Sequence, residues 1–326
     1  MQIPVIEAKG LARRYGSFTA VSDVSFRVEE GQTLILIGPS GCGKTTTLKM
    51  ANRLITPSAG EVFVEGRNVR ELPETVLRRR MGYVIQSIGL FPHYTVSQNI
   101  AVVPRLLNWP RARIRERVGA LLEQLGLPPG QYADKYPHQL SGGQQQRVGI
   151  ARALAAEPPI VLMDEPFGAL DPLARQQIRR DFREIEELRS KTVIMVTHDI
   201  EEAFEMGSLI CLLDKGAVQQ LGRPEELLLS PANDFVQAFL AEKAAQLEFR
   251  AHSLADVFAQ LEQGDGPQGP ALEMPPDTPV LQALYLLARQ GGQGAYGRTL
   301  HYGQWRWFTL EGLFGLFRQM LKRWND

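Results

Sequence analysis

The sequence predicts an α/β protein with a mainly parallel β-sheet at its centre, because three short apolar runs each lead into a helical pattern. The first run is TLILIG, which ends at Gly38 and is followed by KTTTLKMANRL. The other two are IVLMD, which ends at Asp164, and TVIMVTHD, which ends at Asp199. Apolar runs that alternate with helices are typical of parallel strands buried on both faces. We therefore expect a sheet sandwiched between helices.

Two further regions extend this core. From about Ile6 to Val28, polar and apolar residues alternate with few breakers, which indicates antiparallel strands, and EVFVEGRNV indicates a hairpin. Residues Ser97–Tyr132 show helical periodicity, with one apolar face formed by Val118, Leu121, Leu122 and Leu125. An antiparallel β region and a helical region are thus expected beside the parallel sheet.

The end of the chain differs in composition. Helical patterns stop near SPANDFVQAFL, and the Gly/Pro-rich span GDGPQGPALEMPPDTP is typical of a linker or long loop. Beyond it we expect a helix over VLQALYLLARQ, a strand around Gln304–Thr309 and a final helix. We therefore predict a large domain over residues 1–240 and a small C-terminal α+β accessory region over 241–326.

Composition excludes several classes of function. Lys+Arg and Asp+Glu number 36 each, so no global positive field attracts nucleic acid, and no nucleic-acid partner is expected. No stretch reaches the roughly 18–20 apolar residues that cross a bilayer, and MQIPVIEAKG lacks the apolar core of a signal peptide. Two cysteines, Cys42 and Cys211, form no disulfide framework, which suits a reducing cytosol.

A phosphate-binding loop is the strongest single motif. Residues 38–45 fit G-x-x-x-x-G-K-[ST] and lie between an expected strand and an expected helix. Glycines let backbone N–H groups turn toward phosphate oxygens, Lys44 reaches the β- and γ-phosphates, and Thr45 offers its hydroxyl to Mg²⁺. This context disfavours a chance glycine turn. The expected nucleotide-binding residues here are Gly38, Ser40, Gly41, Cys42, Gly43, Lys44, Thr45 and Thr46.

Polar residues follow the other expected strands. Asp164 at a strand end can order the water shell of Mg²⁺, and Glu165 beside it can polarise an attacking water. Alone such a pair is usually a solvated turn, but the phosphate loop upstream reverses that preference. His198 follows a third strand at the sheet edge where ligands bind, and Gln86 follows a short apolar run and could complete the Mg²⁺ shell.

A second glycine-rich turn, LSGGQ at Leu140–Gln144, raises the question of its purpose, because a single nucleotide needs only one such loop. Together with the phosphate loop, Gln86, IVLMDE at Ile160–Glu165, ALD at Ala169–Asp171 and His198, it stands in the order found in ABC-type ATPases. From about Ile6 to Leu240 the chain resembles that family, and Tyr15 matches the position at which the family stacks an aromatic ring on adenine.

This resemblance implies a P-loop ATPase fold of ABC type, with an antiparallel β subdomain and a helical subdomain. It implies ATP as substrate, Mg²⁺ held by Thr45, Gln86 and Asp164, Glu165 as general base, and His198 as the γ-phosphate contact. Two copies would join head to tail, and the intact motifs favour a homodimer over a heterodimer. The residues expected at that interface are Ser141, Gly142, Gly143 and Gln144, which close over the partner's γ-phosphate, and Asp171.

The same resemblance favours an importer subunit. ABC ATPases of DNA repair carry a long coiled coil, and those of translation usually carry two cassettes; neither is seen here. A free-standing cassette suits an importer with permease subunits and a solute-binding protein, peripheral on the cytoplasmic face of the plasma (inner) membrane, where Ser97–Tyr132 would receive the permease's coupling helix. DEPFGALDPLAR and RRRMGYVIQSIGLFPHYTVSQNIAVVP resemble the quaternary-amine branch, which imports osmoprotectants such as glycine betaine, choline or carnitine. An amino-acid importer and a soluble, non-transport ABC switch remain alternatives.

The C-terminal region resembles a CBS unit over PPDTPVLQALYLLARQGG and FTLEGLFGLF, with Ser253–Leu261 as the remnant of a second unit. CBS domains bind adenine nucleotides or sense ionic conditions; the alternatives are another regulatory module or a loosely ordered extension. Trp305 and Trp307 should share one face of a strand. That face could hold a cationic solute, but a small hydrophobic core is the favoured interpretation.

Overall fold

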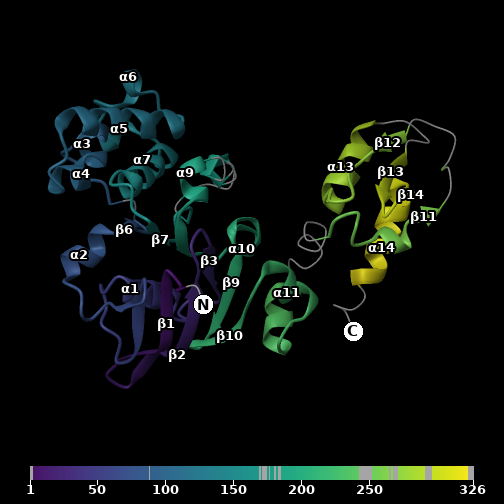
Figure 1. Ribbon diagram of the computed structural model, residues 1–326, viewed down its shortest axis with the longest axis horizontal. Coiled ribbons are helices and arrows are strands. Elements are labelled where there is room, and N and C mark those ends of the chain that lie inside the picture. The colour runs from purple at the N-terminus through teal and green to yellow at the C-terminus, as the bar shows by residue number, and fades with distance from the viewer. Residues whose placement is uncertain are drawn as a thin grey trace. The chain divides into compact units, whose positions relative to one another are not determined.

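The computed structural model describes residues 3–87, 89–168, 170, 175, 177–179, 181–182, 185–241, 252–263, 266, 271–290 and 296–321. The chain divides into two compact units, Met1–Arg223 and Pro224–Asp326 (Figure 1). Residues 224–240, which were grouped with the first domain on sequence grounds, fall in the second unit. Within the part of the chain that the structure describes, no helix combines the length and apolar character needed to span a bilayer.

The first unit is built on one ten-stranded sheet with the order β5-β4-β1-β2-β10-β9-β3-β8-β7-β6. Its parallel part confirms the strands expected from the three apolar runs, and every residue of β7 and β8 is buried because helices cover both faces. The pairs β3·β8, β3·β9, β7·β8 and β6·β7 are all parallel. These strands are β3 (Thr33–Ile37), β6 (Met81–Val84), β7 (Ile160–Asp164), β8 (Thr192–Val196) and β9 (Leu209–Asp214).

An antiparallel region continues the sheet. Strand β1 pairs antiparallel with both β2 and β4, and β4 and β5 form the expected hairpin. The register of β1 with β2 shifts three times, so the ribbon is irregular. The strands concerned are β1 (Ile6–Tyr15), β2 (Phe18–Val28), β4 (Ala59–Val64), β5 (Arg67–Asn68) and β10 (Ala217–Gly222), the last of which joins β2 to β9.

The expected helical region consists of several short helices, which gather at one end of the first unit in Figure 1. Asn108, with a left-handed φ of 57°, and Pro110 separate α4 from α5, and the apolar face expected on the longest helix is buried. The helices of this region are α3 (Val96–Ile100), α4 (Val102–Leu106), α5 (Arg111–Gln124), α6 (Pro129–Tyr132), η1 (Pro137–Gln139) and α7 (Gly142–Leu154). Elsewhere in the unit lie α1 (Lys44–Ala51), α2 (Glu74–Arg79), α9 (Glu186–Arg189) and α10 (Ile200–Met206).

The second unit has its own sheet, with the order β11-β14-β13-β12. One sequence interpretation is corrected here: part of the Gly/Pro-rich span is not a loop but forms β12, which pairs parallel with β13. Ser253–Leu261 packs into the same hydrophobic cluster as the following helices. The elements are α11 (Pro224–Leu229), η2 (Phe258–Gln260), β11 (Glu262–Gln263), β12 (Ala271–Glu273), α13 (Val280–Gln290), β13 (Tyr296–His301), β14 (Gln304–Phe308) and α14 (Leu310–Leu321).

The two tryptophans of β14 share one face, as expected, but that face is not the core. Trp305 lies opposite Leu300 and is 44% exposed, whereas Phe308 on the other face is 2% exposed and belongs to the hydrophobic cluster. The guanidinium of Arg298 lies over the Trp305 ring, 4.7 Å from its centroid. The core interpretation is therefore wrong for Trp305, and the cation over its ring comes from the chain itself.

Candidate nucleotide-binding site

The phosphate-loop residues form the turn between β3 and α1, and its backbone shape requires glycine at two positions. Gly38 has a φ of 145°, and a Cβ there would lie 2.0 Å from the carbonyl oxygen of Leu213. Gly43 has a φ of 102°, and a Cβ there would lie 2.6 Å from the carbonyl oxygen of Ala20. Since no side chain fits at either position, the loop can exist only with the glycines that the motif supplies.

Lys44 is buried within this loop. Its ammonium donates to the carbonyl oxygens of Gly38 at 2.8 Å and Pro39 at 2.9 Å, and it lies 3.7 Å from Cys42 Sγ. Burial raises the pKa of the Cys42 thiol, so this sulfur is a neutral, weak acceptor. An ammonium has three donors, so a phosphate oxygen can displace the sulfur while the two carbonyl bonds remain.

Thr45 and Asp164 join α1 to the end of β7. The Thr45 hydroxyl donates to Asp164 Oδ1 at 2.7 Å, and Asp164 is 3% exposed. Burial raises the pKa of Asp164, and the hydrogen bond from Thr45 lowers it in part. Within the described residues no group of three or more His, Cys, Asp and Glu side chains could hold a metal ion. A hydroxyl with one carboxylate suits Mg²⁺, which takes few protein ligands and completes its shell with phosphates and water.

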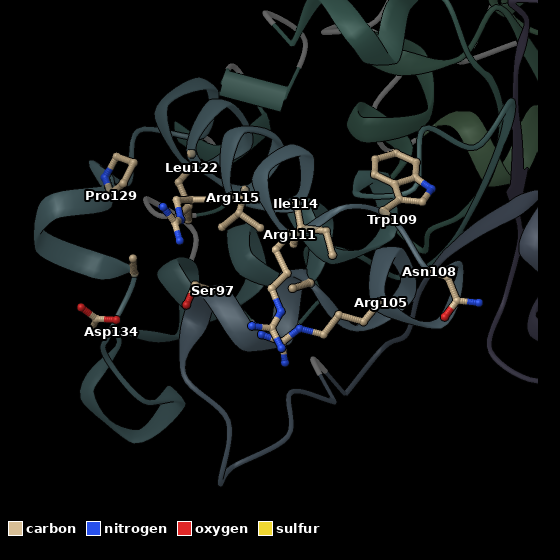
Figure 2. A pocket seen from close by; sticks show the side chains of 14 residues that line it. Ser97, Arg105, Asn108, Trp109, Arg111, Ile114, Arg115, Leu122, Pro129 and Asp134 are labelled. Atoms are coloured by element: carbon tan, nitrogen blue, oxygen red, sulfur yellow. The ribbon is translucent and has the colours of Figure 1, made fainter.

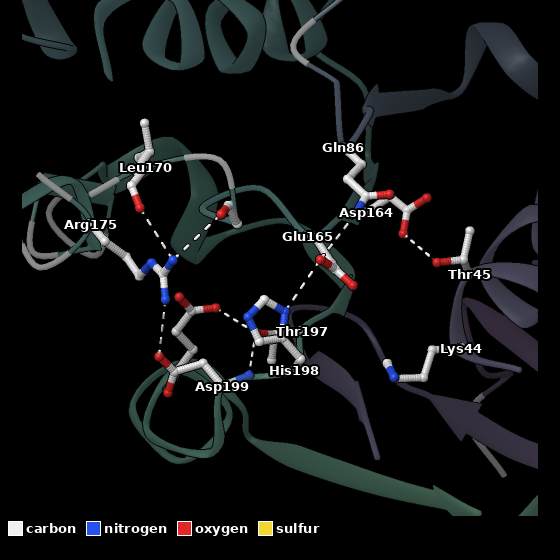
Figure 3. A network of polar contacts seen from close by, with 12 residues as sticks. Lys44, Thr45, Gln86, Asp164, Glu165, Leu170, Arg175, Thr197, His198 and Asp199 are labelled. Atoms are coloured by element: carbon white, nitrogen blue, oxygen red, sulfur yellow. Dashed lines mark hydrogen bonds and ion pairs between the residues drawn. The ribbon is translucent and has the colours of Figure 1, made fainter. Parts of the chain in front are cut away.

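The side chains of Gln86 and His198 both lie against the carboxylate of Glu165 (Figure 3). Gln86 Nε2 donates to Glu165 Oε2 at 3.2 Å, and His198 Nδ1 lies 3.3 Å from the same oxygen. The backbone of Glu165 has a left-handed φ of 45°, and its N–H donates to the carbonyl oxygen of Val196 at 3.0 Å. Such a conformation costs a non-glycine residue about 1 kcal/mol or more, and strain of this kind concentrates at functional sites.

The segment around His198 is anchored on both sides by residues that the sequence interpretation missed. Thr197 Oγ1 donates to Glu202 Oε2 at 2.5 Å, and Asp199 Oδ1 caps α10 by accepting from the backbone N–H groups of Glu201 and Glu202. Glu202 is 3% exposed, and burial raises the pKa of its carboxyl group. An aspartate directly before a helical pattern is an N-cap signal, so the role of Asp199 could have been found in the sequence.

The second glycine-rich turn opens α7 in the helical region. Ser141 is the N-cap: its Oγ accepts from Gln144 N at 3.3 Å, and its N–H donates to Gln144 Oε1 at 2.9 Å. Gly142 and Gly143 form the first turn, where backbone N–H groups have no partner within the helix. Ser141 and Gly142 are exposed, so this helix start is accessible to an anion.

The remaining expected site residues occupy varied positions. Tyr15 ends β1 with 45% of its surface exposed, and the Arg13 guanidinium lies 4.5 Å from the centroid of its ring. Ser40 and Gly41 are exposed at the tip of the phosphate loop, and Thr46 lies in the first turn of α1. Asp171 lies outside the described residues.

A groove of about 960 Å³ crosses the helical region between α3, α5 and α6 (Figure 2). Ile114, Val118 and Leu122 contribute apolar side chains to its lining. Arg105, Arg111 and Arg115 also line it, and within the described residues their guanidinium groups make no ion pair. Asp134 also lines the groove, which therefore combines apolar surface with an excess of positive charge.

The fold and these contacts define the class of protein: an ATP-binding cassette, in which a phosphate loop and its carboxylates lie on one sheet and a second capped glycine turn opens a helix of a separate subdomain. The family model described as "ABC transporter" matches residues 21–168. The chain is 50% identical over 228 residues to the glycine betaine/carnitine/choline transport ATP-binding protein OpuCA of Bacillus subtilis, a match that covers 70% of this chain and 60% of that protein. The choline transport ATP-binding protein OpuBA of the same organism matches to the same extent.

The glycine betaine uptake system ATP-binding protein YehX of Escherichia coli is 48% identical over 263 residues, which cover 80% of this chain and 85% of that protein. The chain belongs to the ABC transporter family of ATP-binding proteins. Among solved structures, the dimeric bacterial ABC transporter cassette MJ0796 aligns with a TM-score of 0.60 and 35% identity, covering 67% of this chain and 98% of that one. A post-hydrolysis state of the same cassette, bound to ADP and Pi, aligns similarly. The expected ABC cassette fold is confirmed.

Proposed function

We propose that the protein is the ATP-hydrolysing, energy-coupling subunit of an importer for quaternary-amine osmoprotectants such as glycine betaine, choline or carnitine. The observation that carries ATP hydrolysis is the Glu165 carboxylate, held between Gln86 and His198 beside the Thr45–Asp164 pair. The solute class is supported by the relatives OpuCA and YehX, whose names assign them to such transport systems.

ATP binds at the phosphate loop in this proposal. Lys44 supplies an ammonium donor to the phosphates from inside the loop, and the start of α1 adds its positive dipole end. The exposed ring of Tyr15 stacks on adenine. The backbone and side chains that surround the phosphates are those of Gly38, Ser40, Gly41, Cys42, Gly43, Thr45 and Thr46.

Mg²⁺ is the proposed cofactor, held by Thr45, Gln86 and Asp164, and when bound it neutralises charge on the phosphates. Because Gln86 uses its amide nitrogen for Glu165, its amide oxygen is the atom left to face a cation. Glu165 orients the attacking water and accepts its proton as general base. His198 holds the Glu165 carboxylate through Nδ1 and contacts the γ-phosphate.

The active form is a head-to-tail homodimer. Ser141, Gly142, Gly143 and Gln144 of one copy bind the γ-phosphate on the other, since a capped helix start with free N–H groups is an anion site. Asp171 lies at the same interface. Both states of the similar cassette MJ0796 are dimeric structures, which supports this assembly. A two-fold axis completes both sites at once.

The helical region carries the contact with the transmembrane permease subunits. The groove lined by Arg105, Arg111 and Arg115 offers an apolar floor and positive charge to a permease helix on the cytoplasmic face of the plasma (inner) membrane. The solute-binding protein then acts on this subunit only through the permease. The C-terminal unit, which contains β12, α13, β13, β14 and α14, is in this proposal a CBS-like regulatory module.

Reconstitution with the permease and the solute-binding protein tests the proposal. Glycine betaine, choline or carnitine should stimulate ATP hydrolysis several-fold, whereas amino acids should not. Stimulation by amino acids alone would point to a different importer, and full activity without a membrane complex would point to a soluble switch. Glu165→Gln in the isolated subunit should abolish turnover and give an ATP-dependent dimer by gel filtration.

A further inference from the structure

The side chain of Arg175 holds two segments that flank the Glu165–His198 contact (Figure 3). Its Nη2 donates to the carbonyl oxygens of Gly168 and Leu170, at 3.4 Å and 3.2 Å. Its Nη1 lies 3.8 Å from Oδ2 of Asp199, the residue after His198. One guanidinium therefore connects the chain that follows Glu165 to the chain that carries His198.

Asp199 divides its two carboxylate oxygens between separate tasks. Oδ1 accepts from the backbone N–H groups of Glu201 at 2.8 Å and Glu202 at 3.2 Å, which fixes the start of α10. Oδ2 faces Arg175 and Arg179, each at 3.8 Å. The ion pair and the helix cap can therefore be separated by mutation, because asparagine keeps the cap and loses the charge.

Half of the His198 side chain is exposed, so its own contacts hold the imidazole ring only loosely. The residues on either side of it are held more firmly. On one side Thr197 is buried and bonded to Glu202, and on the other side Asp199 is held by Arg175. His198 lies between these two anchored residues, so a shift of Asp199 would displace the backbone that carries the His198 ring.

We propose that Arg175 is a positioning residue that couples the 168–170 segment to His198, so that closure of the dimer sets the contact between His198 and Glu165. The inference rests on the proposed function, in which Asp171, next to this segment, lies at the dimer interface. A planar guanidinium suits the task because it binds two carbonyl oxygens and a carboxylate at once, which an ammonium cannot match in geometry. The Nε–H of Arg175 is buried and without a partner among the described residues, so a donor remains for a shifted segment.

The test compares Arg175→Ala, Asp199→Asn and the double variant in the full-length chain, by steady-state ATP hydrolysis. We expect each single variant to lower kcat at least tenfold while KM for ATP changes less than twofold, because the phosphate loop is untouched. The double variant should lose no more than the worse single variant, because each single variant already breaks the ion pair between Arg175 and Asp199; Asp199→Asn also removes the pair with Arg179. Arg175→Lys should restore kcat only in part.

Arg117→Ala is the matched control. Arg117 also donates to two carbonyl oxygens, those of Leu154 and Ala155, and to a carboxylate, Glu187, but it joins the helical region to α9. It should lower the melting temperature and leave kcat within about twofold. A kcat within twofold of wild type for Asp199→Asn or Arg175→Ala, or losses that multiply in the double variant, would overturn the proposal.

A dimerisation assay distinguishes failure of the role proposed for Arg175 from failure of the proposed dimer mechanism. In a Glu165→Gln background, Arg175→Ala should still form the ATP-dependent dimer, because the coupling acts after nucleotide binding. If Glu165→Gln alone stays monomeric with ATP, the proposed dimer mechanism fails. If it dimerises and Arg175→Ala keeps full kcat in the wild-type background, only the role of Arg175 fails.

Discussion

The Thr45 hydroxyl donates to the buried carboxylate of Asp164 at 2.7 Å, and this bond joins the first residues of α1 to the end of β7. It connects two motifs that lie 119 residues apart in the chain. The phosphate loop and the acidic strand end are thus held together by the same atoms that are proposed to meet Mg²⁺.

Thr45→Val should separate structural from metal-dependent effects. The substitution leaves the Asp164 carboxylate without this donor, which costs about 1–3 kcal/mol for a buried acceptor. We expect a lower melting temperature and a larger loss of affinity for ATP with Mg²⁺ than without it, measured by fluorescence titration. Thr47→Val is the control, since the Thr47 hydroxyl is fully buried and has no hydrogen-bond partner among the residues that the structure describes, and its removal should not destabilise the protein.

The glycines of the phosphate loop should differ in their tolerance to alanine. Gly38→Ala brings a Cβ within 2.0 Å of backbone, whereas a Cβ at Gly41 meets nothing within 4 Å and suffers only from its φ of 81°. We expect Gly38→Ala to unfold or to lose ATP binding, and Gly41→Ala to cost about 1 kcal/mol in the free energy of unfolding. Equal melting temperatures for the two variants would contradict this account of the loop.

Ser141→Ala should affect stability and assembly together. Loss of the N-cap of α7 costs about 1 kcal/mol. Thr95 provides a control with the same bonding pattern, because it caps α3 in a capping box with Gln98. Thr95→Ala should lower the melting temperature similarly, but only Ser141→Ala should weaken ATP-dependent dimerisation, read by gel filtration in a Glu165→Gln background.

Glu202 should make stability depend on pH. Burial raises the pKa of its carboxyl group above the ordinary value of 4.5, so the folded state binds a proton more tightly than the unfolded state. Its contribution to stability is therefore fully present below the ordinary value and is lost as pH rises through the raised one. Glu202→Gln keeps the size and the acceptor oxygen, and should gain melting temperature relative to wild type as pH increases across that window. A constant difference at all pH values would count against this assignment.

Much of the first unit could be predicted from the sequence because its signals are local. Burial is indicated by the short apolar runs of β3, β7 and β8. The shape of the phosphate loop is indicated by the spacing of its glycines, again within a few residues. Gln86 and His198 each follow an expected strand, which made them candidates for the site. The order of motifs then indicated which residues share a site.

The features that were missed depend on contacts between distant segments. The position of Arg175 beside Asp199 follows from how two loops meet at the sheet edge, and helix periodicity says nothing of it. Strand β12 has three residues in a Gly/Pro-rich span, and only its pairing with β13 makes it a strand. The exposure of Trp305 depends on which face of the small sheet the helices cover. The contact between Trp305 and Arg298 joins two strands, so the sequence of one strand could not predict it.

The docking of Lys44 on the carbonyl oxygens of Gly38 and Pro39 has a consequence for affinity. Immobilising a free lysine side chain costs about 1.5–2 kcal/mol in rotamer entropy, and here that cost is met when the chain folds. When a nucleotide binds, a phosphate oxygen replaces Cys42 Sγ as the third neighbour of the Lys44 ammonium. Because this ammonium is already ordered, Lys44 contributes to nucleotide affinity with little loss of entropy.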